Sequence, residues 1–155
     1  MPAWAAHASK PQTRASYENW RPAILWAAVL VRVEPDHLLL IDTSGRGDFV
    51  LPGAPITGRQ VPVEAARRAL FGTVVPVFVP VAIDHVQMRR RQVTVHLLAS
   101  LPIPRNEAAE LTPGDRRASP RILPLKDALA LLPSRARARA TAGLAALHAG
   151  RTVPL

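Results

Sequence analysis

Residues 51–73 read LPGAPITGRQVPVEAARRALFGT, and this stretch is the most informative part of the sequence. Pro62 suits the first turn of a helix, Glu64 lies near the positive end of the helix dipole, and Gly72 can supply a left-handed stop. The pattern predicts a helix over residues 62–71 after a polar loop. Residues at helical spacing form an apolar face that would pack on a sheet. They are Val63, Ala66 and Leu70.

Strands are predicted on both sides of this helix. Residues 24–33 form a continuous apolar run, as expected of a strand covered on both faces, and a turn joins them to residues 38–42 in a hairpin. The other predicted strands cover 49–51, 74–83, 92–101 and 121–124, and a long polar loop covers 102–120. Helices are predicted over 125–132 and 134–149. Strands and helices without regular alternation predict an α/β (α+β) fold, with a mixed sheet sandwiched between helices and an added C-terminal helix.

Length and composition predict one domain with two extensions. The chain has 155 residues and is 48% hydrophobic, which suffices for a core. We expect three parts along the chain. Residues 1–22 would form a flexible N-terminal arm held by Trp20, residues 23–132 the domain, and residues 133–155 a basic C-terminal helix and tail. No apolar run is long enough to cross a membrane, so we expect no membrane contact and a cytoplasmic location. The lack of cysteine excludes disulfides and thiolate chemistry.

The formal net charge is +9, and arginine supplies almost all of the positive charge. Such a field favours anionic partners, namely nucleotides, nucleic acid or an acidic protein surface. A GC-rich coding sequence is the alternative source of the arginine, because Lys10 and Lys126 are the only lysines.

The stretch 51–73 resembles the signature loop and helix of the Nudix hydrolase family. Phe49 precedes Leu-Pro-Gly as the family's aromatic residue does, and residues 121–129 are similar to the family's last strand and helix. The resemblance covers roughly residues 23–132 and implies the Nudix fold. It also implies a divalent cation, usually magnesium, that helix carboxylates hold against a pyrophosphate. Such a metal neutralises phosphate charge and activates water.

The signature has lost its carboxylates. The positions that differ from the family pattern are Ala54, Gln60, Ala69, Gly72, Thr73 and Val75. Arg68 and Leu70 are retained, and the family uses them for loop anchoring and packing. Neutral Gln60 and Thr73 offer weak oxygen ligands that will not hold magnesium against water. We therefore expect no metal and no cofactor.

Three other acids are weak catalytic candidates. Glu64 lies one turn too early on the helix, where a helix-start role competes with a metal role. Glu107 and Glu110 lie in the late loop, from which the family sometimes draws a further catalytic acid. They leave open a divergent Nudix hydrolase that uses Mg²⁺ and cleaves a nucleoside diphosphate linked to another moiety. Whether the chain is an enzyme is therefore left open.

The candidate ligand-binding residues are Arg59, Gln60, Arg68, Arg89 and Arg91. In a strand, Arg89 and Arg91 would share a face, whereas in a hairpin turn both would be solvated. The alternative role of this cluster is a charged rim that resists aggregation. Nucleic-acid modules pair such charge with stacking aromatics, and no aromatic residue lies within the arginine clusters of the sequence.

Arginines at 135, 137 and 139 open the last predicted helix, where positive charge opposes the dipole and hints at an anionic partner. The apolar face of this helix would pack on the domain or on a second copy in a homodimer. His96 with Asp84 and Arg91 is a candidate acid–base group, and a purely structural histidine is the alternative.

The sequence thus predicts a catalytically degenerate Nudix-fold protein. Its ligand would be nucleotide-like or phosphorylated, or its partner would be an anionic macromolecule such as a nucleic acid. The alternatives are the divergent hydrolase and a structural or regulatory protein-interaction module.

Overall fold

The computed structural model describes residues 19–150 and 153–154. The strands are β1 (Ile24–Val33), β2 (His37–Asp42), β3 (Phe49–Val50), β4 (Gly53–Pro55), β5 (Phe78–Met88), β6 (Arg91–Ser100), β7 (Ser119–Pro124) and β8 (Val153–Pro154). The helices are α3 (Pro62–Ala66), α4 (Arg105–Ala109), α5 (Leu125–Leu131) and α6 (Ser134–Ala149). Residues 1–18 of the predicted arm lie outside the described residues.

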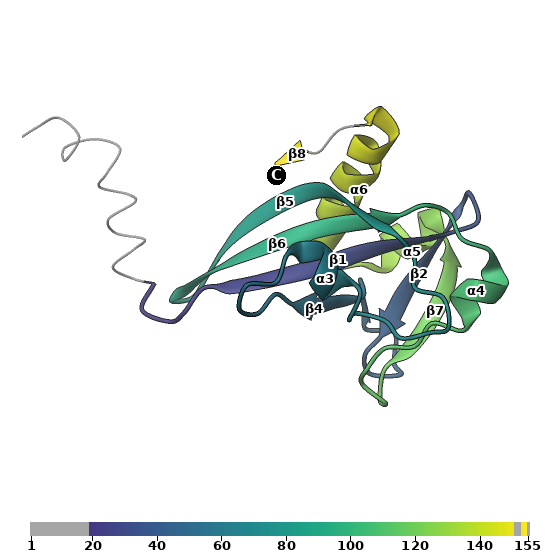
Figure 1. The fold of residues 1–155 in the computed structure, drawn as a ribbon, viewed down its shortest axis with the longest axis horizontal. Coiled ribbons are helices and arrows are strands. Elements are labelled where there is room, and N and C mark those ends of the chain that lie inside the picture. Colours follow the sequence, from purple (N-terminus) through teal and green to yellow (C-terminus); the bar gives the residue numbers. More distant parts are fainter. Residues whose placement is uncertain (1–18, 151–152, 155) are drawn as a thin grey trace, which may run out of the picture.

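The strands form one mixed sheet in the order β3-β2-β1-β6-β5-β8, with β4 paired to β1 and β7 paired to β2 (Figure 1). β1 and β2 pair antiparallel, which confirms the predicted hairpin. β1 and β6 run parallel, with Trp26 opposite Val95. The long β5–β6 hairpin is antiparallel, and its tip projects from the body of the domain.

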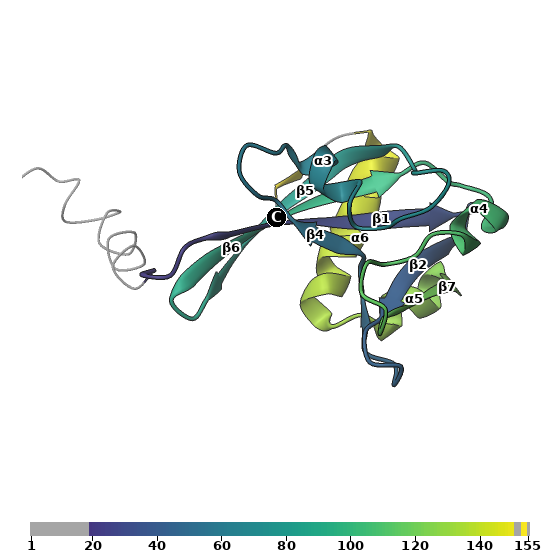
Figure 2. The ribbon, with the colours of Figure 1, turned by 60° about the horizontal axis from the view of Figure 1, so that its bottom comes forward.

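Alternation along β1 divides the core into two clusters on opposite faces of the sheet. Ala27 and Val29 belong to the cluster that contains buried alanines of α3. Ala28 and Leu30 belong to the cluster that contains Ala140 of α6. The sheet therefore lies between α3 and α6, as Figure 2 shows, and the predicted α/β sandwich is confirmed.

α6 packs closely on the sheet through its small residues. A Cβ atom on Gly143 would meet Leu97 Cδ2 and would lie 3.2 Å from Val81 Cγ2. Gly150 ends the helix with a φ of 70°. The apolar residues of the predicted face contact the domain core; they are Ala136, Ala140, Leu144 and Leu147. Of the two predicted alternatives for this face, the structure therefore has packing on the domain.

Several element boundaries differ from the predictions. β5 begins at Phe78 rather than at residue 74, because Pro76 interrupts the preceding segment, and it continues to Met88, because it pairs with β6 up to Arg91. β4 lies where a break was predicted, because Gly53 pairs with Ala28 of β1. α4 lies within the predicted polar loop 102–120. Within the described residues, no helix is long and apolar enough to span a membrane.

Candidate functional site

The signature loop is held by two side chains that the sequence singles out. Arg68 Nη2 donates hydrogen bonds to the Pro55 carbonyl oxygen at 2.9 Å and to Gln60 Oε1 at 2.8 Å. Gln60 Oε1 also accepts a hydrogen bond from the Thr57 backbone N–H at 3.1 Å and lies 3.2 Å from the Thr57 hydroxyl oxygen. Arg68 therefore anchors the loop, as the resemblance implies. Ligand contact by Arg68 and Gln60 stays a prediction.

Replacing Arg68 with alanine should lower the free energy of unfolding by about 1 kcal/mol, because hydrogen bonds from a charged but exposed donor are lost. Urea unfolding followed by circular dichroism measures this change. Arg67→Ala is the matched control, since Arg67 is an exposed neighbour and its loss changes the net charge equally. Equal destabilisation by the two variants would show that Arg68 does not anchor the loop.

The helix after the loop is shorter than predicted. α3 ends at Ala66, and a turn follows it. Phe71 forms a bridge with Thr112, in which each backbone N–H donates to the other residue's carbonyl oxygen at 2.8 Å. A Cβ atom on the next residue, Gly72, would lie 2.9 Å from Leu111 Cδ2. The predicted helix therefore exists but covers only residues 62–66, and its predicted end at residue 71 is wrong, because the Phe71 backbone groups are bonded to Thr112 instead.

The signature region does not fit a magnesium ion. Ala69 is apolar and buried, Gly72 has no side chain, and Thr73 carries one neutral hydroxyl oxygen. Magnesium requires several hard oxygen ligands, usually including carboxylates. Within residues 19–150, no three His, Asp or Glu side chains lie together as a group that could hold a metal ion.

The three candidate acids lie on two short helices. Glu64 is exposed in the first turn of α3. Glu107 is half-buried in the first turn of α4, and Glu110 caps the C-terminal end of that helix. The Glu110 carbonyl oxygen would lie 3.3 Å from a Cβ atom on Gly72, so the late loop runs beside the signature segment. A catalytic role for these acids stays a prediction.

The candidate arginines fall into two groups. Arg59 and Arg68 are exposed on the signature loop and the turn after α3. Arg89 and Arg90 form the turn of the β5–β6 hairpin, and Arg91 begins β6. The cluster therefore lies at a hairpin turn, as one of the two alternatives predicted. Arg89 and Arg90 are exposed there, whereas Arg91 is half-buried. Ligand binding by the candidate arginines stays a prediction.

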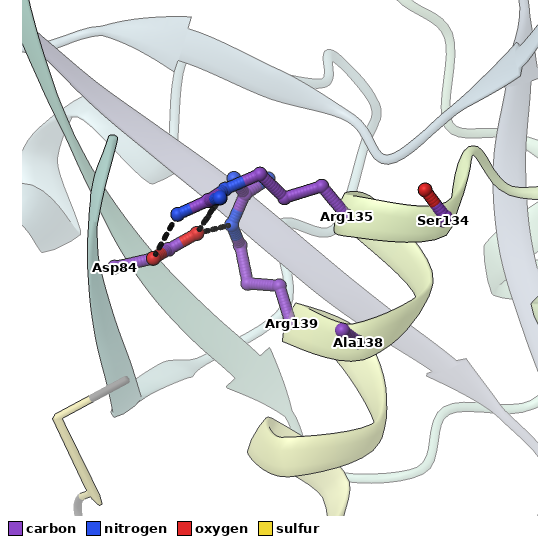
Figure 3. A pocket seen from close by; sticks show the side chains of 5 residues that line it. All are labelled: Asp84, Ser134, Arg135, Ala138 and Arg139. Atoms are coloured by element: carbon purple, nitrogen blue, oxygen red, sulfur yellow. Dashed lines mark hydrogen bonds and ion pairs between the residues drawn. The ribbon is translucent and has the colours of Figure 1, made fainter. Parts of the chain in front are cut away.

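An ion-pair cluster that the sequence did not predict lies on the opposite face of the sheet from α3. Asp84 of β5 accepts hydrogen bonds from Arg135 Nη2 at 3.1 Å and from Arg139 Nη2 at 2.9 Å (Figure 3). Its side chain is 8% exposed, against 14% for Arg139 and 58% for Arg135. The three side chains border an open hollow of about 360 Å³. One carboxylate with two guanidinium groups leaves this cluster with a net positive charge.

Two opposing effects act on the pKa of Asp84. Burial raises it, but the hydrogen bonds from Arg135 and Arg139 and the positive charge of both groups outweigh burial. The pKa is therefore lowered overall, and the carboxylate is ionised at neutral pH. A signal for this cluster does exist in the sequence, since Asp84 lies in an apolar strand segment and the two arginines lie four residues apart, on one helix face.

Arg137 does not contact Asp84 but bonds to the end of α5. Its Nε donates to the Leu129 carbonyl oxygen at 2.8 Å, and its Nη2 donates to the carbonyl oxygens of Ala130 and Leu132 at 3.0 and 3.1 Å. These carbonyls lie at the C-terminal end of α5, where the helix dipole is negative. Each of the three arginines at the start of α6 therefore has a partner inside the molecule, either the end of α5 or Asp84.

The predicted grouping of His96 with Asp84 is wrong. Asp84 lies opposite Val95 in the β5–β6 register, whereas His96 lies opposite Ile83, so the two side chains point to opposite faces of the sheet. Burial, and next the charge of His85, lower the pKa of His96. The His96 ring is therefore neutral at pH 7.

Trp20 corrects the expectation that no aromatic residue accompanies the arginines. The guanidinium carbons of Arg21 and Arg90 lie 5.1 and 5.6 Å from the centroid of its ring. The Arg21 backbone N–H donates to the Arg90 carbonyl oxygen at 3.0 Å. Trp20 is far from residues 89–91 in the sequence but adjacent to them in space.

No protein-family model and no curated protein matches the sequence. Solved structures do match the fold. A MutT protein from Methanosarcina mazei Go1 is 15% identical with a TM-score of 0.63, covering 86% of this chain and 99% of that chain. A Nudix hydrolase from Nitrosomonas europaea is 11% identical with a TM-score of 0.61, covering 87% of this chain and 79% of that chain. The ORF135 protein of E. coli is 16% identical with a TM-score of 0.59, covering 84% of this chain and 94% of that chain. At these identities the likeness concerns the fold, and the chain has the fold of the Nudix hydrolases.

Proposed function

We propose that this chain is a catalytically degenerate Nudix-fold protein that binds a nucleotide-like or phosphorylated ligand without a metal. One observation carries the proposal. α3 ends at Ala66, before the positions at which the family places its two later glutamates, and those positions hold Gly72 and Thr73. The signature segment therefore keeps the anchored loop and lacks the carboxylates that hold magnesium.

The charge of this segment supports an anionic ligand. Arg59, Arg67 and Arg68 are exposed on the loop and the turn after α3, and Glu64 is the only acid in residues 51–73. Without signature carboxylates, a phosphate group meets no cluster of like charge and needs no metal to screen it. Arg59 is the residue we expect to contact the phosphate, because Arg68 is already bound to Pro55 and Gln60.

Isothermal titration calorimetry with MgCl₂ and with a non-hydrolysable ADP-ribose analogue tests this proposal. We expect no saturable magnesium binding and the same analogue affinity in magnesium as in EDTA. Arg59→Ala should weaken analogue binding roughly tenfold, in the range expected when a charge-assisted hydrogen bond is lost. Arg116→Ala is the matched control, because Arg116 is an exposed arginine on a different loop.

The other outcomes each contradict the proposal in a different way. Tight magnesium binding, alone or with the analogue, would restore the divergent hydrolase, with Glu64 and Glu107 or Glu110 as its first candidate ligands. No heat from either titrant would exclude this ligand class and favour a protein-interaction module or another macromolecular partner. The homodimer and the cytoplasmic location stay predictions.

A further inference from the structure

The tip of the β5–β6 hairpin combines an exposed indole with a cluster of arginine side chains. Trp20 is 61% exposed, although two guanidinium groups lie within cation–π distance of its ring. The neighbouring Met88 is 53% exposed. Residues 19–21 and 88–92 together contain four arginines and no acidic residue. A large apolar ring left in water beside several arginines is typical of an interaction surface.

Backbone pairing and side-chain contacts hold this surface in place. The β5–β6 ladder continues to Met88 opposite Arg91, directly before the turn. Gln87 Nε2 donates hydrogen bonds to Asn19 Oδ1 and to the carbonyl oxygens of Met88 and Arg91. The segment that carries Trp20 is therefore attached to the hairpin, and binding there would lose little conformational entropy.

We propose that this hairpin tip binds single-stranded nucleic acid. An unpaired base would stack on the part of the Trp20 ring that the guanidinium groups of Arg21 and Arg90 leave exposed. These two groups and the guanidinium of Arg89 would contact the phosphates on either side of that base. Proteins that bind single strands without sequence preference combine such a ring with basic side chains, because every base has a face that can stack. A duplex keeps its bases stacked on one another and offers the ring no partner. This inference goes beyond the proposed function and does not rest on it.

Intrinsic tryptophan fluorescence and the anisotropy of labelled oligonucleotides test the inference on the full chain. The probes are oligothymidylate and oligouridylate of about 12 nucleotides, within the site sizes known for single-strand binders. Both single strands should quench Trp20 fluorescence on binding, whereas the matching duplex and heparin should not. Affinity should fall with salt, with a slope of about 0.7 per phosphate contact.

Variants of Trp20 and of the two turn arginines separate stacking from charge. Trp20→Leu should weaken oligothymidylate binding roughly tenfold and abolish the quenching, whereas Trp20→Phe should keep most of the affinity. Arg89→Ala with Arg90→Ala should lower the salt slope by about 1.4, the sum for two phosphate contacts. Arg116→Ala with Arg117→Ala is the matched control, because it removes the same charge from an exposed loop elsewhere. Circular dichroism confirms that each variant is folded.

Three results would overturn the inference. Equal affinity for heparin, duplex and single strand would reveal a general polyanion surface. Equal losses from the hairpin pair and the control pair would assign binding to net charge. Failure of both single strands to bind at low salt would leave the tip without a nucleic-acid partner. Binding of the ADP-ribose analogue is measured separately and should be unchanged by Trp20→Leu, so the failure of one proposal does not decide the other.

Discussion

Replacing Asp84 with asparagine is expected to lower the free energy of unfolding by about 3 kcal/mol. The substitution keeps the shape of the side chain but removes the carboxylate that pairs with Arg139, whose side chain is 14% exposed. An uncompensated buried charge is costly, and this estimate takes the low end of the range because Arg135 is 58% exposed and can reach water. Urea unfolding at pH 7 measures the change.

The effect of Asp84→Asn on the free energy of unfolding should depend on pH. The pKa of Asp84 is lowered in the folded protein, so the folded state favours the ionised carboxylate. Its stabilising effect is fully present above the unfolded pKa of about 3.9, and it is lost as the pH falls through the lower folded pKa. The difference in unfolding free energy between the natural chain and Asp84→Asn should therefore shrink below about pH 4.

Asp48→Asn is the matched control, because Asp48 is an exposed acid and its loss changes the net charge equally. The double variant Asp84→Leu with Arg139→Leu should be more stable than Asp84→Leu alone, because the double variant removes the buried guanidinium together with its partner. If Asp84→Asn were no more destabilising than Asp48→Asn, the cluster would not hold α6 on the sheet.

Replacing Gly53 with alanine is expected to lower the free energy of unfolding by about 2 kcal/mol. A Cβ atom at this position would meet Trp26 Nε1 and would lie 2.8 Å from the Ala27 carbonyl oxygen. β4 cannot move away easily, because the Val29 N–H donates to the Pro52 carbonyl oxygen at 2.9 Å and the next loop is bonded to β1 as well. The added methyl group therefore displaces the strand or the indole.

Thermal and urea unfolding measure this effect. The same substitution in a Trp26→Leu variant shows how much of the effect comes from the indole. In a chain that already carries Trp26→Leu, Gly53→Ala should still lower the free energy of unfolding, but by less than in the natural chain. The indole is then absent, whereas the Ala27 carbonyl oxygen remains in place. Gly114→Ala is a control, since its Cβ atom would lie 3.3 Å from an atom of the exposed Phe71 ring, which can shift. Similar stability of Gly53→Ala and Gly114→Ala would show that β4 is not closely packed on β1.

The sequence alone predicted the fold class. The apolar run of β1 and the alternation of apolar and polar residues in β6 are local patterns, and such patterns indicate strands that are buried in a sheet. Ala69, Gly72 and Thr73 lack carboxylates in any conformation, so their chemistry did not depend on the fold.

Tertiary structure decided where the arginines point and where the signature helix stops. α3 ends at Ala66, and Phe71 beyond it bonds to Thr112, a partner that is distant in the sequence. Asp84 meets α6, and Trp20 meets Arg90, only because the sheet brings residues from separate segments together. The periodicity and charge pattern of a sequence reflect only residues that are close together along the chain. Pairing between distant segments depends on the packing of the whole sheet.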